Sequence, residues 1–367
     1  MAKMRNTPPD QRIAPVRPVG RPLLGLTLGD PRGIGPEVIV KALEHQRLYE
    51  MCKPLVIGGA EALRQATEST GIPLLIREAR DVAEARFTPG SADVLIPPAH
   101  SRAGPSSEAG QPGGRLAVDY LTEAVGMAMG RKLDAVVCGP ISPEALRSVG
   151  IPFDGPPELA ASLTQARSFT PLVVAGPIRV SHVTGHMPLR QALAEITRGR
   201  ILSCIRLTHQ GLLRLGVPAP RIAVAAINPH AGAGGLMGEE EKREIAPAVQ
   251  AARQEDINVH GPMAADVLFA RLAAGLYDAA VAMYHDQGHI PAKLLGHRLD
   301  KEGRRPFIGG GIAVLGLPIV FTCVAHGSAF DIVGQAVADE HSMVDAIELA
   351  VRLASPGLRQ ESLTKRT

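Results

Sequence analysis

Short runs of uninterrupted apolar residues alternate along the chain with longer segments of helical periodicity. The apolar runs are rich in Val, Ala and Ile, and most end at a Gly, a Pro or a polar turn. Runs without polar alternation are typical of strands that are covered on both faces, as in a parallel sheet with helices on each side. The pattern predicts strands at residues 23–29, 54–59, 134–140, 171–176, 221–229, 278–285 and 318–327.

Helical periodicity occupies several of the intervals between these runs. It predicts helices over residues 35–45, 115–130 and 239–254. Strands that alternate with helices define an α/β protein with a largely parallel sheet. In such sheets ligands bind beyond the carboxyl ends of the strands, so the polar turns after the predicted strands are the first places to look for a site.

The length of 367 residues is more than one typical domain, and the hydrophobic content of 45% is enough for a sizeable core. We expect a two-lobed subunit over residues 22–353, with a lobe boundary that the sequence does not resolve and a chain that crosses between the lobes more than once. Residues 1–21 read as a disordered basic tail and 354–367 as a C-terminal tail. Two turn-rich loops, 97–114 and 297–311, are either lids or solvated connections.

Composition excludes several classes of protein. The 39 Lys and Arg nearly balance the 36 Asp and Glu, and aromatic residues make up only 3%, so we expect no nucleic-acid partner. No apolar stretch reaches the 18 residues of a membrane span, so we expect no membrane partner. The four cysteines are widely spaced without a metal-type pair, and reduced thiols in a cytoplasmic enzyme are the expectation.

Three histidines, His186, His230 and His285, each lie in a polar turn at or just after a predicted strand. Three neutral imidazoles suit a catalytic divalent ion with open coordination positions, although a single histidine at a strand end is more often only hydrogen-bonded. Asp266 and Asp286 are candidates to orient these ligands or to complete the site. The alternative for Asp266 is a helix N-cap.

Lys293 follows the third histidine by eight residues and is a candidate to bind a carboxylate or to transfer a proton, or else a surface lysine. Three Gly-rich turns are further candidates. Residues 29–37 join a strand to a helix and could hold an anion. Residues 230–241 precede an acidic helix start whose glutamates complement the helix dipole, and 326–334 allow a nucleotide to approach the backbone or form a plain tight turn.

Taken together, these segments resemble the 4-phosphohydroxy-threonine dehydrogenase family of vitamin B6 biosynthesis and its catabolic relatives. The resemblance runs in family order over about residues 22–353. It is carried by LGDPRGIGPE (28–37), VCGP (137–140), GIPFDG (150–155), GHMPLR (185–190), INPHAGAGGLMGEEE (227–241), GPMAAD (261–266), MYHDQGHIPAK (283–293), GLP (316–318) and HGSAFDIVG (326–334).

The resemblance implies a two-domain fold like that of isocitrate and isopropylmalate dehydrogenases, with a cleft between the domains. It implies a homodimer with shared active sites, NAD as cofactor and one divalent metal ion per site, with Zn expected and Mn, Co, Ni or Mg as alternatives. The metal ligands map onto His186, His230 and His285 and the substrate lysine onto Lys293, and Asp266 and Asp286 match acidic positions beside the metal. The expected cofactor-binding residues are Gly327, Ser328, Ala329, Asp331, Gly234 and Gly235.

Several substrate positions depart from the family pattern. The phosphothreonine enzymes carry Gly-His-Thr-Glu where this chain has Gly155-Pro156-Pro157-Glu158, and their later Asn and Arg align with Ile312 and Phe321. The segment HDQGHIPAKLL is closer to a branch that includes terephthalate 1,2-cis-dihydrodiol dehydrogenases. We therefore expect conserved chemistry on a changed substrate, with Pro156, Pro157, Ile312, Phe321 and Lys293 lining its site.

The expected reaction is NAD- and metal-dependent oxidation of a hydroxyl beta to a carboxylate, followed by decarboxylation, on a small-molecule carboxylate such as the terephthalate cis-dihydrodiol. The first alternative is a 4-phosphohydroxy-threonine dehydrogenase, or a relative that acts on a phosphorylated four-carbon sugar acid. A second alternative, from another class, is a ligand-binding descendant without catalytic activity.

Overall fold

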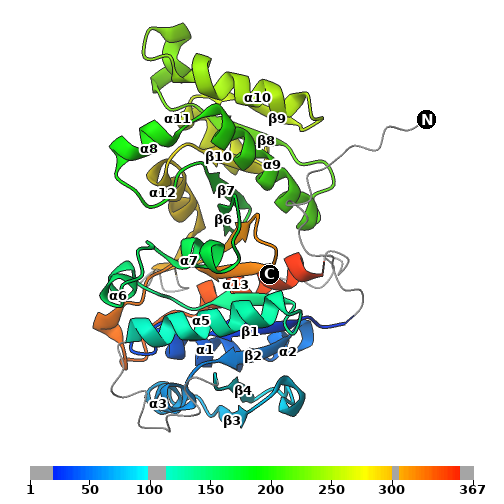
Figure 1. Cartoon of the computed structure of the whole chain (residues 1–367), viewed down its shortest axis with the longest axis vertical. Coiled ribbons are helices and arrows are strands. Elements are labelled where there is room, and N and C mark those ends of the chain that lie inside the picture. Colours follow the sequence, from blue (N-terminus) through cyan, green and yellow to red (C-terminus); the bar gives the residue numbers. More distant parts are fainter. Residues whose placement is uncertain (1–19, 98–112, 300–305, 356–367) are drawn as a thin grey trace, which may run out of the picture.

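The computed structural model describes residues 20–97, 113–299 and 306–355 (Figure 1). Most of the two predicted tails, nearly all of the 97–114 loop and the centre of the 297–311 loop lie outside these ranges. The predictions for those segments therefore remain untested. Within the described residues no helix is long and apolar enough to cross a membrane.

One twelve-stranded sheet runs through the molecule in the order β3-β4-β2-β1-β5-β14-β13-β6-β7-β10-β8-β9, and a separate hairpin pairs β11 with β12. The strands are β1 (Leu23–Thr27), β2 (Lys53–Ile57), β3 (Leu75–Ala79), β4 (Ser91–Leu95), β5 (Ala135–Cys138), β6 (Thr170–Ala175), β7 (Ile178–His182), β8 (Ile222–Ala225), β9 (Val259–Met263), β10 (Ala279–Ala282), β11 (His297–Leu299), β12 (Pro306–Ile308), β13 (Gly311–Leu315) and β14 (Phe321–Val324).

Helices cover both faces of this sheet. They are α1 (Gly35–Glu44), α2 (Gln46–Met51), α3 (Ala60–Thr70), α5 (Gly113–Met129), α6 (Pro143–Ser148), α7 (Pro156–Leu163), α8 (Leu189–Glu195), α9 (Arg198–Arg214), α10 (Ala246–Arg253), α11 (Ala265–Ala273), α12 (His285–Gly296) and α13 (His341–Ala354). Shorter turns of helix are η2 (Val82–Glu84), η4 (Pro229–Gly235), η5 (Glu241–Ile245) and η6 (Phe330–Ile332).

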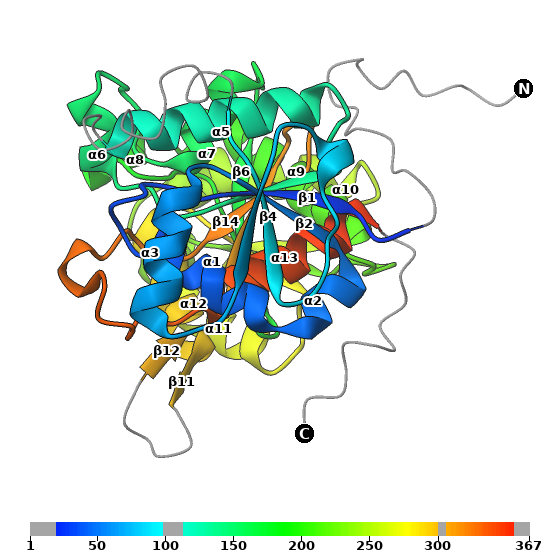
Figure 2. The same cartoon turned by 90° about the horizontal axis from the view of Figure 1, so that it is seen from below.

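The sheet consists of two parallel blocks that run in opposite directions. The strands from β3 to β14 in the sheet order form the first block, and β7, β10, β8 and β9 form the second. Between them, β13 pairs antiparallel with β14 and β6, and β6 pairs antiparallel with β7. Viewed from below, the strands fan out around a common centre, which is the accumulated twist of a large sheet (Figure 2).

The uninterrupted apolar runs are explained by a core on each face of each block. In β5, Val136 and Cys138 face the helix α5 side, and Ala135 and Val137 face the side covered by α1 and α13. The second block repeats this arrangement, with α9 and α10 on one face and α11 and α12 on the other. Because successive side chains point to opposite faces, a strand covered on both sides needs apolar residues at every position.

These observations confirm the predicted α/β class with a largely parallel sheet. The seven predicted strands and three predicted helices all occur, although the third helical segment begins with the π-helical turn η5 before α10. The pattern does not predict β7, whose sequence IRVSH carries polar residues, or the antiparallel pairs at the centre. The domain boundaries and the cleft remain predictions.

Gly35, at the start of α1, allows the backbone there to pack closely against that of Leu28, just after β1. A Cβ atom at Gly35 would lie 1.9 Å from the backbone oxygen of Leu28, which cannot move aside as a flexible side chain could. We predict that Gly35→Ala lowers the free energy of unfolding by about 3 kcal/mol, measured by urea denaturation. The matched control is Gly126→Ala in α5, where a Cβ atom has no neighbour within 4 Å and alanine should stabilise the helix by about 0.5–1 kcal/mol. Equal effects at the two positions would contradict this explanation.

Candidate active site

The three predicted metal ligands follow three neighbouring strands of the second block. His186 follows β7, His285 follows β10 and His230 follows β8, and β10 pairs in parallel with both of the other strands. Parallel neighbours end at the same edge of a sheet, about 4.8 Å apart. The fold therefore brings all three turns to one edge, at the carboxyl ends where α/β proteins bind ligands.

The side chains of His186 and His285 come directly together. Their ring centroids are 4.9 Å apart. Two imidazoles bound to one tetrahedral ion through nitrogens at about 2.0–2.1 Å would have a similar spacing, roughly 5 Å between rings. The pair therefore fits a divalent metal ion.

Each of these two rings has a carboxylate partner at Nδ1. His285 Nδ1 donates to Asp286 Oδ1 at 2.7 Å, and this hydrogen bond lowers the pKa of Asp286. His186 Nδ1 lies 3.8 Å from Glu158 Oε1, and the interaction with Glu158 raises the pKa of His186 despite its partial burial. The hydrogen bond to Asp286 keeps the proton of His285 at Nδ1 and leaves the Nε2 lone pair available, which is the usual arrangement of metal-binding histidines. At 3.8 Å, Glu158 gives His186 a negative charge nearby but no hydrogen bond of normal length.

His230 lies in an unusual turn and does not join this pair. Residues 230–234 all have positive φ, and the side chain of His230 is exposed. Among the described residues, no set of three donor atoms within 4.8 Å of one another includes His186, His230 or His285. The structure thus brings two of the three predicted ligands together, and the metal role of the third remains a prediction.

Glu241 anchors the turn that carries His230. It is only 4% exposed, and its Oε1 accepts hydrogen bonds from the backbone N–H groups of Ile227 at 2.9 Å and Asn228 at 2.8 Å. Its Oε2 accepts from Asn228 Nδ2 at 2.9 Å. Burial alone would raise the pKa of Glu241, but these bonds hold it below its usual value. Glu241 is therefore more than a partner for a helix dipole, the role that the sequence indicated for this acidic run.

We predict that Glu241→Gln lowers the free energy of unfolding at pH 7 by about 2–3 kcal/mol, because it removes charge-assisted bonds and points an amide at donors. Since the folded-state pKa of Glu241 is lowered, its contribution is complete above the ordinary glutamate pKa of 4.5 and is lost as the pH falls further. Urea denaturation between pH 7 and pH 3 should therefore show that the free energies of unfolding of the wild type and of Glu241→Gln become more similar as the pH falls. A constant difference over that range would contradict the proposed anchor.

Two more predicted catalytic residues, Lys293 and Asp266, differ in their relation to the histidine pair. Lys293 lies two turns along α12 from His285, and its positive charge lowers the pKa values of His186 and Asp286. Asp266 is exposed in the first turn of α11, where the N-cap is Ala264, so the N-cap alternative for Asp266 is wrong. Within the described part of the chain, Asp266 makes no hydrogen bond to the histidines.

The predicted cofactor loop packs against two other turns of the first block. The backbone oxygen of Ser328 accepts a hydrogen bond from Ile34 N at 3.0 Å, and Asp30 N donates to the oxygen of Pro140 at 3.1 Å. Gly327 and Asp331 are exposed, whereas Ser328 is buried and Ala329 has a φ of 41°. The amide at the start of α1 is thus already bonded, which weakens the prediction of an anion site at residues 29–37.

The other predicted cofactor residues, Gly234 and Gly235, belong to the turn after β8. Both have positive φ, at 70° and 98°. A Cβ atom at Gly235 would lie 2.5 Å from Lys242 Nζ. Their cofactor role stays a prediction.

The predicted substrate positions divide into two kinds. Pro156 and Pro157 begin α7 next to Glu158, on the side of the histidine pair, and Pro156 is partly exposed. Ile312 in β13 packs against a core cluster of each block. Phe321 is only 1% exposed and packs within the first-block core, so this conformation does not favour a substrate contact for its ring.

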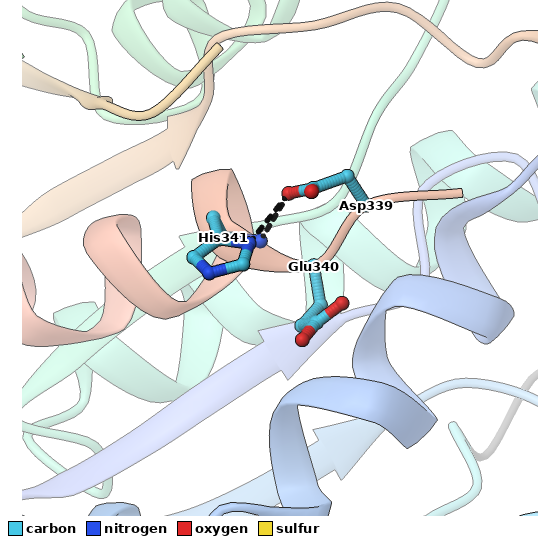
Figure 3. A group of neighbouring side chains, drawn as sticks. All are labelled: Asp339, Glu340 and His341. Atoms are coloured by element: carbon cyan, nitrogen blue, oxygen red, sulfur yellow. Dashed lines mark hydrogen bonds and ion pairs between the residues drawn. The ribbon is translucent and has the colours of Figure 1, made fainter. Parts of the chain in front are cut away.

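One compact group of potential metal ligands lies elsewhere, at the start of α13. Asp339, Glu340 and His341 form the one set of three such donors within 4.8 Å among the described residues (Figure 3). Asp339 Oδ1 accepts hydrogen bonds from His341 N at 2.9 Å and Nδ1 at 2.8 Å, and Glu340 Oε1 pairs with His45 Nε2 at 3.4 Å. These bonds connect the side chains to one another and to His45, so the group is explained as a local network at the start of α13, in the first block.

Sequence reasoning missed three residues at the histidine edge. Glu158 was noted only as the end of a changed motif, yet it pairs with His186. His289 stacks on His285, and His182 contacts His289 at a tilted angle with ring centroids 4.5 Å apart. Burial lowers the pKa of His289 to about 4 and that of His182 well below its usual value. The spacing of four residues between His285 and His289 was the available signal, since it puts both on one helix face.

The fold and the candidate site, with paired histidines at strand carboxyl ends, are typical of an α/β enzyme that binds its ligand at that edge of the sheet. The chain belongs to the family described as pyridoxal phosphate biosynthetic protein PdxA, whose model matches residues 50–350. This confirms the resemblance seen in the sequence. The individual relatives that this chain matches are named dehydrogenases, so the chain is an oxidoreductase of that class.

The individual relatives match over most of their length. A D-threonate 4-phosphate dehydrogenase of Cupriavidus necator is 41% identical over 336 residues, which cover 91% of this chain and 98% of the relative. A 4-hydroxythreonine-4-phosphate dehydrogenase of Desulforapulum autotrophicum is 38% identical, covering 91% and 96%. The crystal structure of a 4-hydroxythreonine-4-phosphate dehydrogenase from Burkholderia phymatum has a TM-score of 0.75 at 38% identity, covering 92% and 99%.

These matches overturn the predicted terephthalate cis-dihydrodiol substrate. The structure of a terephthalate 1,2-cis-dihydrodiol dehydrogenase from Burkholderia xenovorans LB400 has a TM-score of 0.59 at only 28% identity, covering 91% of this chain and 98% of that one. The enzymes named for phosphorylated substrates are markedly more similar. The replaced residues at Pro156, Pro157, Ile312 and Phe321 were wrongly taken to outweigh similarity over the whole chain.

Proposed function

We propose that this protein is an NAD- and metal-dependent dehydrogenase of a phosphorylated four-carbon hydroxy acid, with D-threonate 4-phosphate or 4-hydroxythreonine 4-phosphate as the first candidates. The reaction oxidises a hydroxyl beta to a carboxylate, and the keto acid then loses carbon dioxide. The observation that carries the proposal is the His186–His285 pair, with its two carboxylate partners and Lys293 close by. The names of the relatives support the substrate class.

His186 and His285 would hold the metal ion through Nε2, with His230 as the third ligand. Zn is the expected ion, and Mn, Co, Ni and Mg are the alternatives. A bound divalent ion would lower the pKa of the substrate hydroxyl and stabilise negative charge on its oxygen. Asp286 would keep the proton of His285 at Nδ1, so that its Nε2 remains a ligand, and the negative charge of Glu158 lies 3.8 Å from His186 Nδ1.

Lys293 is the charged group that would bind the substrate. Its ammonium would pair with a carboxylate or phosphate, or would transfer the proton that follows loss of carbon dioxide. Its effect on the pKa values of His186 and Asp286 supports a position near the metal ligands. Pro156 and Pro157 have no side-chain donors, so other groups must bind the phosphate.

NAD would bind at the loop after β14, through Gly327, Ser328, Ala329 and Asp331, with Gly234 and Gly235 from the turn after β8. The exposed Gly327 offers backbone without a side chain, and the packing of Ser328 against Ile34 supports a preformed loop. Asp266 completes the proposed set beside the metal.

We further propose a homodimer in the cytoplasm, with both subunits contributing to each site. The observation in favour is exposed apolar surface on two helices that both lie on the left in Figures 1 and 2: Leu189 and Leu193 on α8, and Ile290, Leu294 and Leu295 on α12. Helix α12 carries His285 and Lys293, so a partner seated there would adjoin the site. The four cysteines are all free and buried, which agrees with a reducing compartment.

The test is a substrate panel followed by NADH absorbance. Each phosphorylated acid is offered with NAD or NADP and with each of the five metals, beside unphosphorylated D-threonate and a cis-dihydrodiol carboxylate. We expect metal-dependent reduction of NAD with a phosphorylated acid and little with the other two. Turnover of the unphosphorylated acids alone, or unchanged turnover in a chelator, would refute the proposal.

A further inference from the structure

Two histidines that the proposed function does not use lie next to His285: His289 lies directly against it, and His182 lies against His289. The ring of His289 stacks on that of His285, with centroids 3.9 Å apart and planes 10° apart. The ring of His182 contacts His289 with centroids 4.5 Å and planes 36° apart, and its centroid lies 6.3 Å from that of His285. The three rings form one contiguous series of contacts that bends at His289, and we call this group the histidine column.

His182 forms the buried end of the column. It is the last residue of β7 and is 4% exposed, and neither ring nitrogen forms a hydrogen bond of normal geometry. A Cβ atom at Gly288 would lie 2.3 Å from His182 Nε2, so glycine at this position lets the first turn of α12 reach the ring. Burying an imidazole without hydrogen bonds costs free energy, and a leucine would fill the space without that cost. Packing alone therefore gives no reason for a histidine here.

His289 links the column to the backbone of the metal-ligand turn. Its Nδ1 donates a hydrogen bond to the carbonyl oxygen of His285 at 3.2 Å, four residues earlier in the helix. That bond and the stacking fix the ring plane of His289 and, through it, that of His285. In nearly parallel rings the ring nitrogens point within separate planes, so His289 and His285 do not converge on one ion in this arrangement.

We propose that the histidine column positions the imidazole of His285 for metal binding, with His289 as the direct support and His182 as its buried base. The inference rests on the proposed function, because it takes His285 as a metal ligand. His182 and His289 are positioning residues: they act on the metal through the orientation of His285 and bind neither metal nor substrate. Outer supports of this kind typically change metal affinity by 10–100-fold.

The experiment measures Co²⁺ binding to the full chain by competition titration and by visible absorption, with no turnover needed. We expect His289→Leu, which keeps apolar volume without a ring, to weaken Co²⁺ binding at least about tenfold and to shift the absorption bands. His289→Phe keeps the stacking surface and should retain most of the affinity. His182→Leu should weaken binding less than His289→Leu, since it acts through one more ring. The control is His45→Leu, on the exposed surface of the first block, which should bind like the wild type.

The outcomes separate this inference from the proposed function. If wild type binds no Co²⁺, or His285→Ala binds it as wild type does, the metal site itself is refuted and the inference falls with it. If His285→Ala abolishes binding while His289→Leu and His182→Leu match wild type in affinity and spectrum, only the column is refuted. Should His289→Leu not fold, as judged by circular dichroism, His289→Gln replaces it; loss of affinity there supports the column, and wild-type affinity refutes it.

Discussion

Replacing His285 with alanine is expected to reduce kcat/KM for NAD reduction by about a thousandfold or more and to abolish metal binding. The imidazole lies 4.9 Å from that of His186 and is hydrogen-bonded to Asp286, so under the proposed function its loss removes a metal ligand that the other proposed ligands do not replace. Metal stabilisation of charge in a transition state is worth several kcal/mol, and about 4 kcal/mol corresponds to a factor of a thousand. The measurements are NADH absorbance with a phosphorylated four-carbon acid and metal content by mass spectrometry.

The matched control is Asp286→Asn, which keeps all the proposed ligands but replaces the charged acceptor of His285 with an amide. This variant should lower kcat/KM by about 10–100-fold, and added metal should restore part of the activity. Activity of His285→Ala within a few-fold of wild type, or full recovery of that variant with excess metal, would contradict a ligand role for His285.

Replacing Lys293 with methionine is expected to lower kcat/KM by roughly 10- to 100-fold, because one charge-assisted hydrogen bond to an anionic substrate is worth about 1.5–3 kcal/mol. The same variant should raise the pKa of His186 in the metal-free protein, since the nearby ammonium lowers it in the wild type. Activity assays measure the first effect, and NMR titration of the histidine rings measures the second.

Lys293→Arg separates binding from proton transfer. An arginine retains the charge but stays protonated, so a purely electrostatic role predicts recovery of KM and kcat together. A proton-transfer role predicts recovery of KM with kcat still low and a changed pH profile. An unchanged pKa of His186 in Lys293→Met would show that the lysine lies farther from the histidines than the structure indicates.

Much of the site could be predicted because strand topology converts distant sequence positions into neighbours. His186 and His285 are 99 residues apart, yet β7 and β10 pair in parallel, and His285 directly follows a buried apolar run. A polar turn after such a run can be recognised from the local sequence alone, and strand pairing then places it beside turns that are far away in the sequence. The same reasoning places His230 at the correct edge of the sheet. It does not predict that the side chain of His230 lies apart from the other two.

The parts that could not be predicted depend on side-chain partners and on unusual backbone. Nothing in the sequence indicates that Ala231 and Ala233 adopt positive φ, a conformation usually left to glycine. Likewise, the acidic run at 239–241 gives no sign that Glu241 alone turns inward to the loop. The substrate prediction was wrong for another reason, because a few replaced residues show that contacts changed without showing which molecule they now meet.

The reversal of strand direction at β6 and β13 has a consequence for synthesis on the ribosome. The second block, β7 to β10, comes from one continuous stretch between Ile178 and Ala282, so its strands can pair as soon as that stretch has emerged. The first block cannot close then, because β14 (Phe321–Val324) must insert beside β5 and α13 must cover the sheet near β1. The strands β1 to β5 therefore keep an open strand edge until β14 and α13, residues 321–354, have been synthesised.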